Sequence, residues 1–169
     1  MVKSKDQKQA DLDARLRIVA FEPSHAEAFR DLNLDWIEEY FVVEELDRKH
    51  LDFPQESFVD TGGAILMAEL DGRVVGCCAL LKHSDNVYEV SKMAVMREYR
   101  GTGIGKRLLR AVIEHARSMG ARRLEIISST RLPPAIELYK KTGFVEVPLE
   151  SDAYARGNIA LELRFNEAD

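Results

Sequence analysis

The sequence is poor in cysteine, with only Cys77 and Cys78 among its 169 residues. In an extended strand, two neighbouring side chains point to opposite faces, so a disulfide between these cysteines would be strained. Two adjacent cysteines also lack the spacing of zinc ligands. We therefore expect two small strand residues without a metal or redox role, in a protein of the reducing cytoplasm.

Long apolar runs and an excess of basic charge are also missing. No stretch reaches the roughly 18 apolar residues of a membrane helix. Residues 1–15 carry charges but lack the apolar segment of a signal peptide. The 24 basic side chains are outnumbered by 29 acidic ones, which gives a formal net charge of -5. A protein that binds the phosphate backbone needs a concentrated basic face. We therefore expect neither a nucleic-acid partner nor a membrane.

The composition is that of one ordinary globular domain. Hydrophobic residues make up 46% of the chain and charged residues 31%, as in typical globular proteins, and the length suits a single core. Residues 1–14 are polar and lack periodicity, so we expect a flexible N-terminal leader there. Residues 15–169 are then the single domain.

Apolar periodicity and turn residues predict a mixed α/β (α+β) domain. Strands are expected at residues 15–21, 64–70, 74–81, 87–95, 124–127, 144–147 and 158–165. Helices are expected at 25–40, with a break near Asn33, and at 42–51, 104–119 and 133–141. Short turns join the second, third and fourth strands into an antiparallel meander, and the crossover through the helix 104–119 should be parallel.

A glycine-rich loop between a strand and the long helix is the most informative segment. It consists of Arg100, Gly101, Thr102, Gly103, Ile104, Gly105 and Lys106. Its glycines permit tight turns and close approach of a ligand, and the N–H groups of a helix start attract anions such as a diphosphate. A glycine-rich turn without a ligand is the alternative. A dinucleotide fingerprint would need glycine at Lys106, and a Walker-type loop would need glycine at Arg100 and a hydroxyl residue at Arg107.

Two runs of the chain together resemble the GNAT superfamily of N-acetyltransferases. Residues 93–105, MAVMREYRGTGIG, resemble its acetyl-CoA motif, Gln/Arg-x-x-Gly-x-Gly/Ala. Residues 134–144, PAIELYKKTGF, are similar to its second landmark, which ends in Leu-Tyr-x-x-x-Gly-Phe. The runs occur in the family's order, separated by one helix and one strand. The resemblance implies a mixed, mostly antiparallel sheet of about seven strands flanked by helices.

The resemblance also implies how acetyl-CoA binds as the co-substrate. Backbone groups of Met93 and Val95 would hold the pantetheine arm, and the amides of the loop from Arg100 to Lys106 would hold the pyrophosphate. Many relatives carry an asparagine after the strand 124–127, where Ser129 stands here. Its hydroxyl has a shorter reach, which leaves its role open.

Tyr139, in the second landmark, would protonate the departing thiolate. A phenol has a reference pKa of about 10, so it carries its proton at neutral pH and can act as a general acid. The alternative is a tyrosine that only packs in the core.

Direct transfer to a primary amine also needs a group that deprotonates the amine. Glu89 is the first candidate, because its strand leads to Met93 and alternation places Glu89, Ser91 and Met93 on one face. A solvated glutamate is the alternative, and His83 is a second candidate base.

The acceptor would be a small-molecule or peptide amine, and the sequence gives opposite hints about its charge. Acidic residues at the expected acceptor cleft suit a cationic acceptor, or form a solvated face: Asp31, Asp35, Glu38, Glu39, Glu44, Glu45 and Asp47. Tyr154 and Arg156 are further acceptor contacts, and Arg156 suits a carboxylate.

A non-catalytic acyl-CoA sensor or regulatory module is the alternative function, although Tyr139 and the complete glycine loop favour catalysis. The final strands allow pairing across a homodimer, as in many relatives.

Overall fold

Seven strands form one sheet in the computed structural model, which describes residues 1–166. The strands are β1 (Leu16–Ala20), β2 (Ala64–Leu70), β3 (Arg73–Lys82), β4 (Val87–Val95), β5 (Arg123–Ser128), β6 (Val145–Val147) and β7 (Ile159–Arg164). Their spatial order is β1-β2-β3-β4-β5-β7-β6. Only the β4–β5 pair is parallel. The expected mostly antiparallel sheet and its parallel crossover are therefore confirmed.

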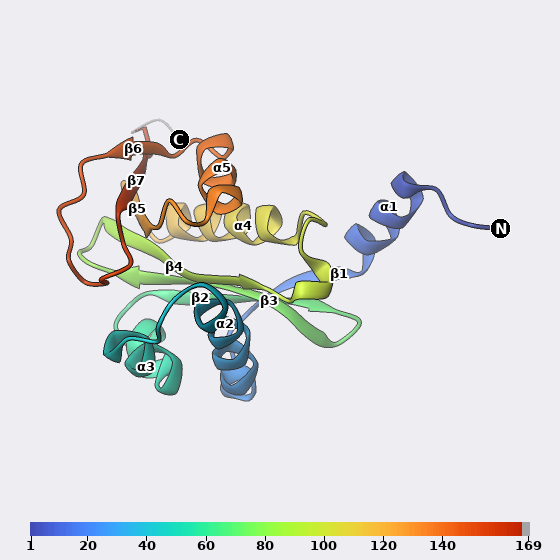
Figure 1. The fold of residues 1–169 in the computed structure, drawn as a ribbon, viewed down its shortest axis with the longest axis horizontal. Coiled ribbons are helices and arrows are strands. Elements are labelled where there is room, and N and C mark those ends of the chain that lie inside the picture. Colours follow the sequence, from blue (N-terminus) through green and yellow to red (C-terminus); the bar gives the residue numbers. More distant parts are fainter. Residues whose placement is uncertain (167–169) are drawn as a thin grey trace.

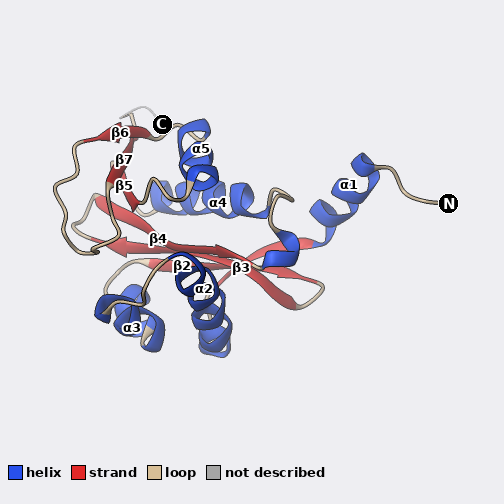
Figure 2. Ribbon diagram, viewed as in Figure 1, coloured by secondary structure: helices blue, strands red, loops and turns tan. Residues whose placement is uncertain are grey.

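Helices cover both faces of this sheet (Figures 1 and 2). The helices are α1 (Lys5–Arg15), α2 (Ala26–Tyr40), α3 (Glu45–Asp52), α4 (Ile104–Ser118) and α5 (Pro133–Lys141), with short helical turns at Pro23–His25, Gln55–Val59 and Arg97–Tyr99. α4 and α5 lie on one face, and α2 and α3 lie on the other. Within residues 1–166, no helix is long and apolar enough to cross a membrane.

Each face of the sheet has its own buried core. The apolar stripe predicted for α4 is buried: Ile104, Leu108, Leu109, Val112, Ile113 and Ala116. Each fully buried leucine among them contributes about 1.5–3 kcal/mol. Cys78 belongs to the core beneath α4, whereas Cys77 packs on the α2 side with Phe29 and Phe58. The neighbouring cysteines thus point to opposite faces as expected. Burial raises the pKa of both thiols, that of Cys77 to about 12, so they stay neutral.

The expected break near Asn33 is wrong, because α2 runs through it without interruption. Asn33 is fully buried, and its side chain finds partners inside the helix. Its Nδ2 donates to the Phe29 carbonyl (2.9 Å), and its Oδ1 accepts from Trp36 Nε1 (3.0 Å). A polar residue that satisfies its own groups in this way need not end a helix.

The N-terminal segment contains a helix, α1, where the sequence pattern indicated a leader without periodicity. Ser4 and Gln7 form a capping box: Ser4 Oγ accepts from the Gln7 amide, and Gln7 Oε1 accepts from the Ser4 amide. No residue of α1 is buried, so apolar periodicity gave no signal for it. The helix also contacts the glycine loop, since Gln9 Nε2 donates to the Thr102 carbonyl (2.7 Å).

Gly63 provides a test of the sheet's packing. A Cβ at this position would overlap the Leu80 carbonyl oxygen and lie 2.9 Å from the Phe58 carbonyl oxygen. Both are backbone atoms, so we expect Gly63→Ala to lower the free energy of unfolding by about 2 kcal/mol. Gly105→Ala is the control, because its Cβ would meet only side chains at 3.7 Å or more, and it should be neutral or stabilising by up to about 1 kcal/mol. Equal urea midpoints for the two variants would contradict this packing.

Candidate active site

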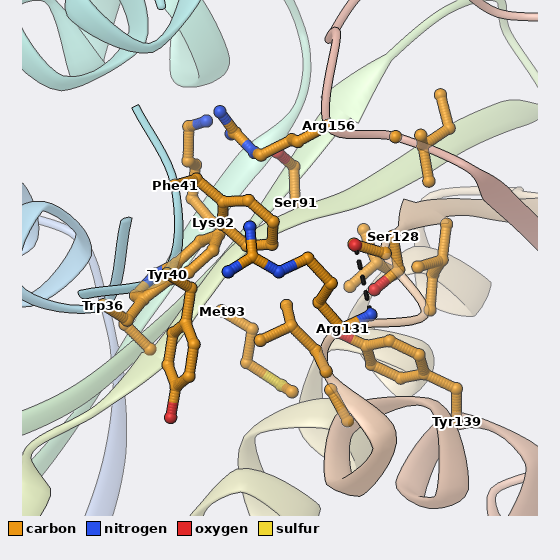
Figure 3. A pocket seen from close by; sticks show the side chains of 18 of the residues that line it. Trp36, Tyr40, Phe41, Ser91, Lys92, Met93, Ser128, Arg131, Tyr139 and Arg156 are labelled. Carbon is orange, nitrogen blue, oxygen red and sulfur yellow. Dashed lines mark hydrogen bonds between the residues drawn. The ribbon is translucent and has the colours of Figure 1, made fainter. Parts of the chain in front are cut away.

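A cavity opens where β4 and β5 separate (Figure 3). The two strands pair from Val87 opposite Arg123 to Glu89 opposite Glu125, and the pairing ends there although β4 continues to Val95. The cavity has a volume of about 300 Å³, and residues 89–95 line it. Backbone groups in the second half of β4 therefore face the cavity instead of a neighbouring strand. They suit an extended ligand that contains amide bonds.

Six further parts of the chain complete the walls. These are the end of α2 with the residue after it, Arg100 at the start of the glycine loop, the second half of β5, the loop after β5, α5, and the segment before β7. They contribute, among others, Trp36, Tyr40, Phe41, Ser129, Arg131, Tyr139, Tyr154 and Arg156.

A β-bulge at Lys92 bends β4 where the two strands separate. Between Cys77 and Ala79, a step of two residues on β3 matches a step of three on β4, from Ser91 to Ala94. Lys92 has a φ of 52°, which is unusual for a residue with a side chain. One extra residue bends a strand and increases its local twist. The bulge thus redirects β4 away from β5.

The bulge overturns the expectation that Glu89, Ser91 and Met93 share one face. Val90 belongs to the core beneath α4, so its neighbour Glu89 points to the α2 side. Met93, however, packs against the α4 core. The extra residue between them exchanges the faces, which simple alternation cannot reveal.

The glycine loop leads from the end of β4 into α4. Gly101 and Gly103 have φ values of 76° and 88°, which glycine adopts without strain. A Cβ at Gly101 would meet no atom within 4 Å, and one at Gly103 only the side chain of Gln9 at 3.9 Å. A ligand can therefore approach this backbone closely. The first N–H groups of α4 have no acceptor within the helix, so they are available to an anion.

A second hollow lies beside this loop and is lined by Gln9, Asp13, Gly103, Lys106, Arg107 and Arg110. Its three cations, Lys106, Arg107 and Arg110, outnumber the one carboxylate of Asp13, which favours an anionic ligand in this hollow.

Tyr139 projects from α5 toward the cavity and is only 8% exposed (Figure 3). Its ring packs edge-on against Phe144, with centroids 6.3 Å apart. Burial raises the pKa of the phenol above its usual value, so the group carries its proton at neutral pH. Tyr139 is thus a buried residue on the cavity wall that carries its proton.

Glu89 is buried on the cavity wall, and its Oε1 lies 2.9 Å from His83 Nε2. The alternative of a solvated glutamate is therefore wrong. The structure brings the two candidate bases together as one pair. The hydrogen bond to Glu89 and then its charge raise the pKa of His83, although partial burial opposes this shift.

Ser129 is buried in the cavity wall. Its Oγ accepts a hydrogen bond from the Arg131 amide (3.2 Å), and its carbonyl accepts one from the Leu132 amide (2.9 Å). Ser129 therefore shapes the loop that begins α5.

A buried ionic cluster borders the cavity on the side of α3. Asp47 is fully buried and accepts hydrogen bonds from Lys92 Nζ (2.5 Å) and, in bidentate geometry, from Arg156 (2.7 Å to each oxygen). Lys92 also donates to the Tyr154 hydroxyl (3.1 Å), which lies 3.3 Å from His50 Nδ1. The cluster thus ties α3, β4 and the segment before β7 together.

Two cations share one carboxylate in this cluster. Burial opposes the ionisation of Asp47, but hydrogen bonds from Arg156 and the charge of Lys92 outweigh it, and the pKa of Asp47 lies well below its usual value. Burial lowers the pKa of Lys92, although Asp47 opposes that shift. Removing one partner of such a buried pair typically costs about 3–5 kcal/mol.

The sequence indicated Asp47, Tyr154 and Arg156 but missed Lys92 and His50. Lys92 could have been found because it stands in a mostly apolar strand. A lysine that such a strand buries needs a charged or polar partner.

Four of the seven acidic residues named for this region, Asp35, Glu39, Glu44 and Asp47, pair with cations of the same chain. Arg97 pairs with Asp35 (2.9 Å), and Arg100 pairs with Glu39 (3.2 Å). Glu44 pairs with Arg156 (3.1 Å). The predicted acidic face is therefore mostly neutralised where it borders the cavity. Residues 1–166 hold no group of three or more His, Cys, Asp or Glu side chains suited to a metal ion.

Comparisons with known proteins point to one family. Residues 27–144 match the model of the Acetyltransferase (GNAT) family. An uncharacterized N-acetyltransferase of Mycobacterium tuberculosis is 36% identical over 89 residues, which cover 53% of this chain and 57% of that protein. The IAA acetyltransferase of Azospirillum brasilense is 34% identical over 115 residues, or 62% of this chain and 75% of that protein. The match to the mycobacterial relative thus spans little more than half of its length.

Solved structures share the fold. A GNAT acetyltransferase from Staphylococcus aureus has a TM-score of 0.80 at 20% identity and covers 88% of this chain and 98% of its own. A GNAT acetyltransferase from Elizabethkingia anophelis, with acetyl-CoA bound, has a TM-score of 0.65 at 19% identity, with coverage of 89% and 99%.

His50 predicts acid sensitivity of the fold. Burial, and after it the charge of Lys92, lowers the pKa of His50 from 6.5 to about 4. As the pH falls from about 6.5 to about 4, the unfolded chain binds a proton at His50 that the folded chain does not bind. At pH 4, the free energy of unfolding is therefore lower by about 3 kcal/mol. His50→Gln removes this titration. Urea unfolding from neutral pH to pH 4 should therefore show the variant losing about 3 kcal/mol less than wild type. If the free energy of unfolding falls equally with pH in wild type and variant, the lowered pKa of His50 is contradicted.

Proposed function

Because the chain belongs to the GNAT acetyltransferase family, we propose that it transfers the acetyl group of acetyl-CoA to the amine of a small molecule or peptide. The observation that carries this proposal is the cleft between β4 and β5. Arg100 of the glycine loop, Tyr139 and Glu89 all line the cavity in this cleft.

The residues of the cleft fit acetyl-CoA. Backbone groups of Met93 and Val95 would hold the amide bonds of the pantetheine arm. The amides of Gly101 to Lys106 would hold the diphosphate at the positive end of α4. Bound acetyl-CoA supplies an acetyl group that is already activated as a thioester.

Two proton transfers accompany the reaction, and the chain offers one group for each. A bond forms between the amine nitrogen and the acetyl carbon, and the bond between that carbon and sulfur breaks. Glu89 takes the proton that the amine loses, and His83 holds the carboxylate in place. Tyr139 gives its proton to the departing thiolate, which leaves as a thiol. Both groups are largely shielded from water, which strengthens their interactions with the reacting atoms.

Release of free thiol from acetyl-CoA in the presence of a panel of primary amines tests the function. Thiol release that depends on the amine, together with the acetylated product, is expected. Tight binding of acetyl-CoA without amine-dependent release would instead indicate a sensor of acyl-CoA.

Gly103→Glu should abolish binding of CoA while the domain stays folded. The new side chain would occupy open space, but its carboxylate would repel the diphosphate. Gly103→Asn is the matched control, because asparagine tolerates the positive φ and adds no charge. Calorimetric titration with CoA measures both. An affinity of the glutamate variant within about twofold of wild type would remove the loop from the binding site, and the asparagine variant separates the effect of the charge from that of the side chain.

Tyr139→Phe removes only the hydroxyl group. The single-turnover rate of acetyl transfer should fall roughly tenfold to a thousandfold, with little change in CoA affinity, because the proton is delivered in the transition state. Tyr88→Phe is the control, since Tyr88 is also buried but does not line the cavity. If both variants react at the wild-type rate, Tyr139 only packs in the core.

A further inference from the structure

The walls of the cavity carry more positive than negative side chains. Four cations line it, Lys92, Arg100, Arg131 and Arg156, against the single carboxylate of Glu89. Asp47 is fully buried and is no part of the lining. A ligand inside the cavity therefore meets mainly the cationic members of these ion pairs.

Three of the four cations already have carboxylate partners. Lys92 and Arg156 share Asp47, and Arg100 pairs with Glu39. Arg131 differs from them: in the part of the chain that the structure describes, its guanidinium makes neither an ion pair nor a hydrogen bond. Arg131 is thus the cation that is available to a ligand.

Arg131 reaches across the cavity from the loop before α5 toward the residue that follows α2 (Figure 3). Its guanidinium lies over the ring of Phe41, 5.0 Å from the centroid, and Arg156 lies 5.7 Å from the same ring. The ring of Phe41 positions the planar guanidinium by stacking, and this contact does not use the N–H groups of the guanidinium. A guanidinium held in this way presents a fork of donors that matches a carboxylate.

We propose that the acceptor is an amino acid, and that Arg131 binds its carboxylate while the amine reacts beside Glu89. This proposal rests on the proposed acetyl transfer and names the acceptor class. Asp35, Glu39, Glu44 and Asp47 are paired with cations of the chain, which speaks against a purely cationic acceptor. The cavity of about 300 Å³ must also admit the acetyl end of the co-substrate, so the acceptor has to be small.

Matched acceptors test the carboxylate. L-Methionine, L-methioninamide and 3-(methylthio)propylamine share one side chain but differ in the group next to the amine, and leucine and phenylalanine provide parallel sets. With wild-type protein, kcat/KM should be at least about tenfold higher for the best amino acid than for its amide or amine. An amide or amine that reacts equally well would overturn the proposal.

Substitution of Arg131 assigns the effect to this residue. Arg131→Gln should lower kcat/KM for the amino acid by about 10- to 100-fold, mainly through KM, and Arg131→Lys should fall in between. The kcat/KM for the amide and the KM for acetyl-CoA should each change by less than about twofold. The amino acid and its amide differ in the basicity of the amine, but this difference is the same for both proteins. The ratio of kcat/KM for the amino acid to kcat/KM for the amide is therefore compared between wild type and variant. Arg164→Gln, an exposed arginine of β7 outside the cavity, is the control.

Two outcomes separate failure of this proposal from failure of acetyl transfer itself. A raised KM for acetyl-CoA in Arg131→Gln would assign Arg131 to the co-substrate and overturn the proposal alone. If wild type acetylates no amine, titration of the twenty common L-amino acids into the CoA-bound protein decides. Binding that Arg131→Gln abolishes would support the carboxylate site without catalysis, and no binding would overturn the site.

Discussion

The buried ion pair between Asp47 and Lys92 is the contact on which the cavity depends. It joins α3 to the bulge of β4, and Arg156 adds the segment before β7 to the same carboxylate. These three parts of the chain are far apart in sequence. Because an unpaired charge in this environment is costly, the pair holds them in one arrangement. The position of Lys92 at the bulge, with its positive φ, couples this arrangement to the direction of β4.

The consequences of the bulge extend to the rest of the site. β4 leaves β5 after Glu89, so that its backbone becomes available and the cavity can form between the two strands. The same bulge exchanges the faces of β4, which places Glu89 on the α2 side and Met93 on the α4 side. The two residues thus lie on different sides of the sheet, although both line the cavity. The glycine loop at the end of β4 then turns the chain into α4, and Arg100 at the start of this loop lines the cavity.

Most of the fold could be predicted from local signals. The meander of β2, β3 and β4 followed from alternation and tight turns, and α4 followed from its apolar stripe. α1 could not be found from apolar periodicity because it buries nothing, although its capping box was visible in the sequence. Asn33 misled because its partners inside α2 depend on the packed structure.

The candidate site was predictable where a short motif carries it and hidden where distant residues meet. The glycine loop and Tyr139 stand in recognisable runs of sequence. The pairing of Glu89 with His83 spans a turn, and the cluster around Asp47 spans more than a hundred residues, from α3 to Arg156. The contacts of Lys92 in this cluster do not follow from alternation, because the bulge changes which face of β4 carries this residue.

A crystal structure with CoA and an acceptor bound tests most directly whether this cavity is the site of acetyl transfer. The pantetheine amides should bind the backbone of Met93 and Val95, and the diphosphate should lie on the amides of Gly101 to Lys106. The CoA sulfur should lie within hydrogen-bonding distance of the Tyr139 hydroxyl, with the acceptor amine on the side of Glu89. CoA bound outside the cleft between β4 and β5, or with its sulfur directed away from Tyr139, would contradict this assignment.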